Sequence, residues 1–136
     1  LEKENTIIIS EGDHLGKIFF KDIYANLRLH ICEYTFEEHD QVVAYSLGIP
    51  FASTMVFAAT MKHQDAPGTT FKRHMNIARG LLSEDDYLLT EILFNPRTPH
   101  QLARIQEELS ILQEIIKEKD SDKMKAYLTK IRKNIE

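Results

Sequence analysis

Two groups of residues in this sequence combine the types and spacing that chemistry uses. The first is His39 and Asp40, adjacent near the start of the stretch TFEEHDQVVAYSLGIPF, residues 35–51. Histidine can move protons near neutral pH. Adjacent helical side chains do not face each other, so this is not an acid–base pair by itself. The alternative is structural: an aspartate favoured by the helix dipole, and a histidine packed against a preceding strand.

The second group is cationic and consists of Lys72, Arg73 and Arg79. Lys72 and Arg79 are seven residues apart, so they would share one face of a helix. Two cations on one face could hold a dicarboxylate, with the arginine gripping a carboxylate through two hydrogen bonds. A solvated helix face is the alternative interpretation.

Other kinds of site have no signal in the sequence. The six histidines show no HxxxH, HxH or Cys/His spacing, so no metal site is predicted. No GxGxxG, GxxxxGK or GxSxG is present, so the sequence shows neither a nucleotide cradle nor a nucleophile elbow. Cys32 is the single cysteine and cannot form an internal disulfide, which favours a reducing compartment, the cytoplasm. We expect it to be a small buried apolar residue.

Composition narrows the class of protein. The 136 residues are 43% hydrophobic, enough for a core, and carry a net charge of −4 without a basic stripe. Nucleic-acid binding is therefore not expected. We find no run of about 18 apolar, uncharged residues, so no membrane-spanning segment is predicted. Because the first residue is leucine, we expect the chain to be a fragment of a longer protein.

The N-terminal part has the pattern of a β-α-β unit. The stretch NTIIIS, residues 5–10, has three consecutive isoleucines, which is typical of a strand buried on both faces of a parallel sheet. Residues 17–27 have helical spacing of apolar side chains, and residues 29–34 alternate like a strand. The crossover between two such parallel strands should be right-handed.

The remainder predicts helices. Thr35 and Glu38 form a capping box at the start of the central helix, and Gly48 and Pro50 should bend it. Its second half is apolar on nearly every face, so we expect other helices to enclose it. Further helices are predicted at residues 71–82, after Ser83 as cap, from Thr98 as cap, and at residues 122–135. The helix from Thr98 carries a seam with alternating gaps of three and four, suited to packing along another helix: Leu102, Ile105, Leu109, Leu112 and Ile116.

The residues described above give the chain a resemblance to the prephenate dehydrogenase family. The likeness lies in a strand, a helix, and a strand leading into LHICEYTFEEHD, followed by AYSLGIPF in an apolar helix. The later helices match by order and length. The resemblance implies a mainly α fold: a helical dimerisation domain like the C-terminal domain of 6-phosphogluconate dehydrogenase, residues 35–136. Residues 1–34 would be the β-α-β end of a Rossmann nucleotide-binding domain.

The resemblance also implies a reaction, the oxidative decarboxylation of prephenate to 4-hydroxyphenylpyruvate in tyrosine biosynthesis, with NAD or NADP. Members bind the cofactor mainly through an upstream domain that also holds the catalytic histidine. This fragment should therefore contain no catalytic residue and be inactive alone. The chain would form a homodimer through its helical domain and bind prephenate. Alternatives are arogenate dehydrogenase and a non-catalytic helical dimerisation module.

The resemblance assigns substrate contacts residue by residue. His39 and Asp40 match the family's His-Asp pair, and Lys72 matches a lysine in a Phe-Lys step. The family's carboxylate-binding arginine falls near Asn76 or Gly80, so Arg79 is the nearest candidate and Arg73 the second. The family often has a histidine twelve positions after the first, where this chain has Phe51. A contact to the ring end of the substrate would therefore be absent or supplied differently.

Overall fold

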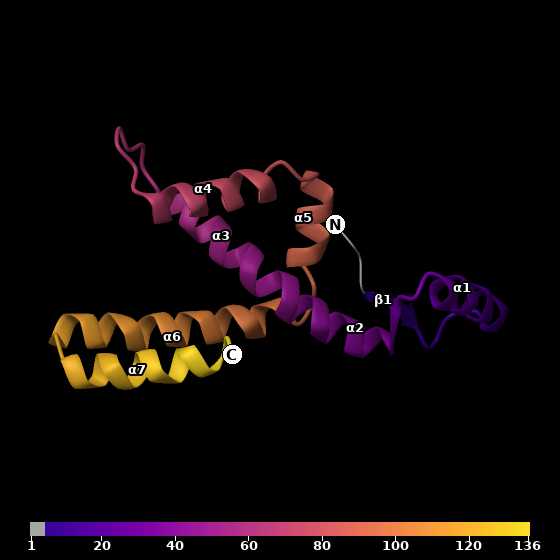
Figure 1. The fold of residues 1–136 in the computed structure, drawn as a ribbon. Coiled ribbons are helices and arrows are strands. Elements are labelled where there is room, and N and C mark those ends of the chain that lie inside the picture. The colour runs from indigo at the N-terminus through magenta and orange to yellow at the C-terminus, as the bar shows by residue number, and fades with distance from the viewer. Residues whose placement is uncertain (1–4) are drawn as a thin grey trace. The chain divides into compact units, whose positions relative to one another are not determined.

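The computed structural model describes residues 5–136, so the first four residues of the predicted nucleotide-binding segment lie outside it. Within these residues the fold is mainly helical, about 70% helix, with a small two-stranded parallel sheet near the N-terminus (Figure 1). The elements are β1 (Asn5–Ile9), α1 (His14–Asn26), β2 (His30–Tyr34), α2 (Phe36–Val43), η1 (Ala44–Gly48), α3 (Ile49–Thr60), α4 (Thr69–Leu81), α5 (Asp86–Leu93), α6 (Thr98–Glu118) and α7 (Ser121–Lys133). Because α2, η1 and α3 are continuous, they form one long helix among six.

The predicted β-α-β unit is confirmed. β1 and β2 pair in parallel, with Asn5 opposite His30 and Ile9 opposite Tyr34. Between them α1 begins at the Asp13 cap, whose carboxylate accepts the Gly16 N–H at 2.6 Å. Parallel strands need such a crossover because a tight turn can only join antiparallel ones.

The two faces of this sheet differ in how they are covered. Ile8 and Glu33 are opposite each other in the register, and Glu33 accepts a hydrogen bond from Lys21 of α1 at 2.7 Å. Ile8, on this face, is buried. Ile7 and Cys32 point to the opposite face, where Ile7 stays 43% exposed. Cys32 is only partly buried, so the prediction that it is a buried core residue is wrong for this chain alone.

The central helix begins as predicted and changes form before its proline. Thr35 and Glu38 make the full capping box. Five residues, Ala44–Gly48, then form a π-helical turn, and α3 continues from Ile49. Pro50 has no N–H to donate, and its ring would crowd the backbone carbonyl one turn earlier in the helix. The wider π turn accommodates the missing hydrogen bond and leaves space for the ring. The predicted interruption therefore takes the form of a π turn.

The prediction that other helices enclose the second half of this helix is wrong within the described residues. α3 has no buried residue, and Val56 is 60% exposed. α4 packs against it. One helix among the described residues, Phe36–Thr60, is long and apolar enough to span a membrane by length and composition, although the sequence analysis predicted no such segment. Length and composition alone do not separate a spanning helix from a core helix.

The helices after α3 start and end close to the predicted positions, but two caps differ. Asp85, not Ser83, caps α5 by accepting the N–H groups of Tyr87 and Leu88. The Ser83 hydroxyl instead donates to the carbonyl of Gly80 and closes α4. Thr98 does begin α6, but the residue is 99% buried and its hydroxyl has no hydrogen-bond partner among residues 5–136.

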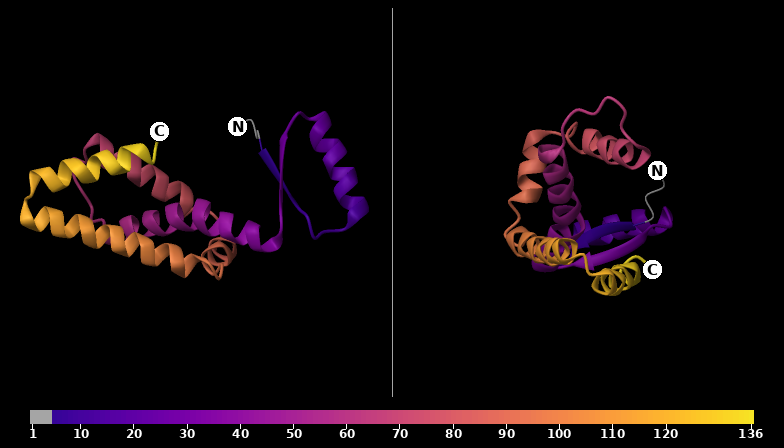
Figure 2. Two further views of the ribbon diagram at one scale, coloured as in Figure 1. Left: turned by 90° about the horizontal axis from the view of Figure 1, so that it is seen from below. Right: turned by 90° about the vertical axis from the view of Figure 1, so that its left-hand side faces the viewer.

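The chain divides into two compact units, Leu1–Thr98 and Pro99–Glu136. The second unit is a hairpin in which α6 and α7 run in opposite directions (Figure 2). Its turn passes through Lys119, whose backbone has a positive φ of 55°. Lys130 of α7 donates to Glu108 of α6 at 2.5 Å, and Ile115 is the buried centre of the hairpin.

Candidate functional site

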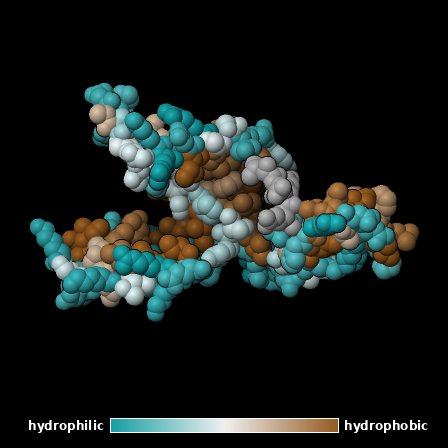
Figure 3. Space-filling model, in the orientation of Figure 1, coloured by the Kyte–Doolittle hydropathy of each residue, from teal (hydrophilic) through white to brown (hydrophobic). Residues whose placement is uncertain are grey.

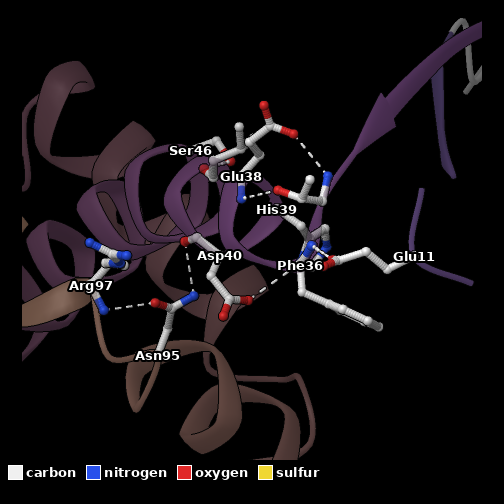
Figure 4. A network of polar contacts seen from close by, with 10 residues as sticks. Glu11, Phe36, Glu38, His39, Asp40, Ser46, Asn95 and Arg97 are labelled. Atoms are coloured by element: carbon white, nitrogen blue, oxygen red, sulfur yellow. Dashed lines mark hydrogen bonds and ion pairs between the residues drawn. The ribbon is translucent and has the colours of Figure 1, made fainter. Parts of the chain in front are cut away.

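The start of α2 is held in place from the β-α-β side. The Thr35 hydroxyl accepts the Glu38 N–H at 3.1 Å, and the Thr35 N–H donates back to the Glu38 carboxylate at 2.8 Å. The Phe36 N–H donates to Glu11, which follows β1, at 2.6 Å (Figure 4). Three of the unpaired N–H groups at this helix start are thus satisfied. They fix the turn that carries His39 and Asp40 next to the end of β2.

A second set of contacts holds the same turn from the other side. The Asn95 amide donates to the backbone carbonyl of Asp40 at 3.0 Å, and its oxygen accepts the Arg97 N–H at 2.9 Å (Figure 4). The Arg97 guanidinium in turn pairs with Glu37 at 2.5 Å. Asn95 is 92% buried, so these bonds are shielded from water. The turn between α5 and α6 is therefore fastened to α2.

His39 and Asp40 lie side by side without a hydrogen bond. Nδ1 of His39 is 3.6 Å from Oδ1 of Asp40, closer than the sequence reasoning anticipated but too long for a hydrogen bond. Both side chains are more than a third exposed. An imidazole in this position is open to a ligand.

The three predicted cations lie elsewhere, all on exposed positions of α4. Arg79 donates to the side chain of Asn76 at 3.3 Å, and no ion pair involves any of the three among residues 5–136. The start of α4 packs on α3 through Phe57, whose ring centroid is 5.6 Å from that of Phe71 and 5.4 Å from that of His74.

These contacts set how far the two groups are apart. Phe57 follows His39 by 18 residues along one continuous helix, which at 1.5 Å per residue is about 27 Å. Lys72 and Arg73 lie at the Phe57 end. α4 then runs back along α3, so that Gly80 comes opposite Pro50 and Phe51. Arg79, beside Gly80, is thus the predicted cation nearest to His39. The helix rises about 18 Å between His39 and Phe51. The five predicted site residues therefore do not form one cluster within a single chain.

A groove between α3, α4 and α5 was not predicted from the sequence. Its volume is about 410 Å³ and its lining is mostly apolar, with Glu84 as the single charged residue: Pro50, Phe51, Thr54, Ile77, Gly80, Leu81, Glu84 and Leu88. Phe51, the position where the chain departs from the family pattern, forms part of its wall. No signal local to the sequence could show that Phe51 and Leu81 share a groove, because 30 residues separate them.

Two further observations bear on the kind of site. Among residues 5–136, no three His, Cys, Asp or Glu side chains gather closely enough to hold a metal ion. Comparison of the chain with known protein families and with curated proteins finds no match in either.

Proposed function

We propose that this chain belongs to an NAD(P)-dependent dehydrogenase, as the segment that joins a nucleotide-binding domain to a helical substrate-binding domain. More particularly, we propose a prephenate dehydrogenase. The observation that carries the proposal is the direct passage from β2 to α2: a parallel strand ends at Tyr34, and a capped helix with His39 and Asp40 in its first turns starts at once.

The sheet supports the α/β part of this proposal. Parallel strands occur almost only in sheets covered on both faces, and a two-stranded unit is marginal alone. The face that carries Ile7 and Cys32 also carries Ile9 and Tyr34, with Asn5 and His30 at one end. Its mostly apolar character is expected if further helices and strands belong beside it. A purely helical dimerisation module would not be expected to contain a parallel β-α-β unit, so this unit favours the dehydrogenase over the module.

The proposed reaction is an oxidative decarboxylation. A hydride leaves the ring carbon that bears the hydroxyl, a base takes the hydroxyl proton, and carbon dioxide leaves as the ring becomes aromatic. NAD or NADP would accept the hydride. The base and the Gly-rich cofactor loop would belong to the upstream domain, so we expect the chain alone to be inactive. His39 and Asp40 would contact the substrate at the junction.

Lys72, Arg73 and Arg79 would bind the carboxylates of the substrate. Arg79 is the first choice because it lies nearer to His39 than Lys72 and Arg73 do, and because an arginine can grip a carboxylate through two bonds. Prephenate and arogenate differ in the side chain that this part of the pocket would contact, so arogenate dehydrogenase remains the close alternative. We further propose that the protein is a homodimer in the cytoplasm.

A hybrid protein tests this function. Placed after the nucleotide-binding domain of a prephenate dehydrogenase, the chain should support reduction of NAD or NADP that depends on prephenate. His39→Asn should lower kcat/KM roughly 10- to 100-fold, since a hydrogen bond to a charged group contributes about 1.5–3 kcal/mol. His100→Asn, on exposed α6, is the matched control and should change little. A folded hybrid that oxidises neither prephenate nor arogenate would refute the proposal.

A further inference from the structure

The groove between α3, α4 and α5 has mostly apolar walls and is open to solvent. Phe51 of α3, Ile77 of α4 and Leu88 of α5 lie in its lining, and Ile77 and Leu88 are 60% and 45% exposed. Figure 3 shows hydrophobic atoms in the hollow that these three helices surround. Its volume of about 410 Å³ falls at the lower end of the range for small-molecule sites. The groove therefore has the size and the lining for a ligand with one ring or a short apolar chain.

The space in this groove depends in part on Gly80. This glycine lies in the last turn of α4 and belongs to the lining of the groove. A methyl group there would meet no atom within 4 Å, so no neighbouring segment requires a glycine at this position. A glycine inside a helix lowers stability relative to alanine. A larger side chain at residue 80 would reach into the groove and reduce the space for a ligand.

The charge at one end of the groove is negative. Glu84 is the single charged residue of the lining, and no ion pair involves it among residues 5–136. Gly80 and Leu81 end α4 beside it, where the helix dipole has its partial negative charge. Arg79 does not line the groove, and its guanidinium bonds to Asn76, one turn back along α4. This end should therefore attract an ammonium group and repel a carboxylate.

We propose that this groove binds a small amine, with the protonated amine at Glu84 and the attached ring or short apolar chain against Phe51, Ile77 and Leu88. The Glu84 carboxylate would accept an N–H of the ammonium group, and Thr54 supplies a hydroxyl in the lining as a second acceptor. The proposal stands apart from the dehydrogenase reaction, because Glu84 would repel a dicarboxylate such as prephenate.

Nuclear magnetic resonance of the isotope-labelled full chain tests the site with 2-phenylethylamine as the probe. The methyl signals of Ile77, Leu81 and Leu88 should shift and saturate, with a Kd on the order of 1 mM, as expected for so small a ligand. 2-Phenylethanol has the same skeleton with a hydroxyl in place of the ammonium group. It should bind about two- to fivefold more weakly, a modest factor because Glu84 is exposed. 3-Phenylpropionate, which carries a carboxylate, should bind more weakly still.

Two substitutions separate the charge from the space. Glu84→Gln should bind the amine and the alcohol equally well, whereas Glu91→Gln, on an exposed position of α5 outside the lining, should keep the preference for the amine. Gly80→Leu should abolish binding of both compounds, because the new side chain occupies the groove. Its helical content, followed by circular dichroism, should be retained, since the side chain enters open space.

Three results would overturn the proposal. The first is equal affinity of the parent chain for the amine and the alcohol. The second is unchanged amine binding in a folded Gly80→Leu chain. The third is a dependence of the groove signals on protein concentration before any amine is added, which would show that a second copy of the chain fills the groove. These readouts need no catalytic activity, so they hold whether or not the chain belongs to a dehydrogenase.

Discussion

Asn95 holds the backbone of the candidate site at Asp40 in place, although it is not itself one of the predicted site residues. The sequence analysis gave Asn95 no part in the candidate site. In the structure the Asn95 amide bonds to Asp40 and to Arg97, 55 and two residues away in sequence. The capping box of Thr35 and Glu38 could be predicted because its partners are three residues apart. The Asn95 bond could not, because it depends on the tertiary fold.

Removing this side chain should therefore cost stability. Asn95→Ala leaves the part-buried Arg97 N–H and Asp40 carbonyl with one partner fewer, and should lower the free energy of unfolding by about 1–3 kcal/mol. Urea denaturation followed by circular dichroism measures this. Asn76→Ala, at an exposed position of α4, is the control and should change stability little. Equal effects of the two substitutions would show that Asn95 does not fasten α2.

A second pair of substitutions separates two glycines that the sequence could not distinguish. A methyl group on Gly48 would lie 3.3 Å from the hydroxyl of Thr98, which is 99% buried and has little room to move. We expect Gly48→Ala to destabilise the chain by about 1 kcal/mol, the crowding outweighing the gain in helix propensity. Gly80 has open space around it, and Gly80→Ala should stabilise by about 0.5–1 kcal/mol. Thermal unfolding would compare them, and a stabilising Gly48→Ala would contradict the close packing.

At the scale of elements, local patterns predicted where helices are and missed what surrounds them. The β-α-β unit, the start of α2 and the helical hairpin follow from periodicity and caps. The π turn at Ala44–Gly48 does not, since Pro50 predicts an interruption but not its form. The wrong cap of α5 has a simple cause: Ser83 and Asp85 are both good caps, and the tertiary path of the chain decides between them.

The hairpin should be sensitive to acid. Hydrogen bonds from the backbone N–H groups of Lys123 and Asp122 lower the pKa of the Asp120 carboxyl, and the Lys130 hydrogen bond lowers that of Glu108. A folded-state pKa below the unfolded one stabilises at higher pH, and the stability is lost as pH falls through the folded value. Helical content of α6 and α7 should therefore decrease below about pH 4.

Asp120→Asn tests the origin of this decrease. The amide oxygen can still accept the cap bonds but does not titrate, so part of the acid transition should disappear while the helix persists at neutral pH. Circular dichroism of the full chain between neutral and acidic pH measures both effects. Asp65→Asn, in the exposed loop before α4, is the control. An unchanged acid transition in Asp120→Asn would contradict the role of the cap.

At the scale of the whole molecule, the chain exposes more surface than compact proteins of the same length normally do. Its accessible surface is 10,984 Å². Two separate compact proteins of the lengths of its two units would expose roughly 8,600 Å² together. The expectation of an enclosed α3 was therefore wrong for a physical reason: an apolar helix predicts that something covers it, but not which chain supplies the cover.

This excess is consistent with a chain that works as part of a larger assembly. The uncovered sheet face at Ile7, the open faces of α3 and the exposed apolar side chains of α6 lie in three different places. The proposed nucleotide-binding domain would extend the sheet, and the second copy in the proposed homodimer would cover α6. The mainly helical class with a small parallel sheet could be read from the sequence. The separation of His39 from the predicted cations could not, because it depends on the path of α4 along α3.

The products of the reaction test the proposed function most directly. With the hybrid protein, prephenate and NAD or NADP, carbon dioxide release and nicotinamide reduction should be measured in the same sample. The account predicts equal amounts of both, together with 4-hydroxyphenylpyruvate, and formation of all three roughly 10- to 100-fold more slowly in the His39→Asn hybrid at low prephenate concentration. Nicotinamide reduction without carbon dioxide release, or no reduction by a folded hybrid, would contradict it.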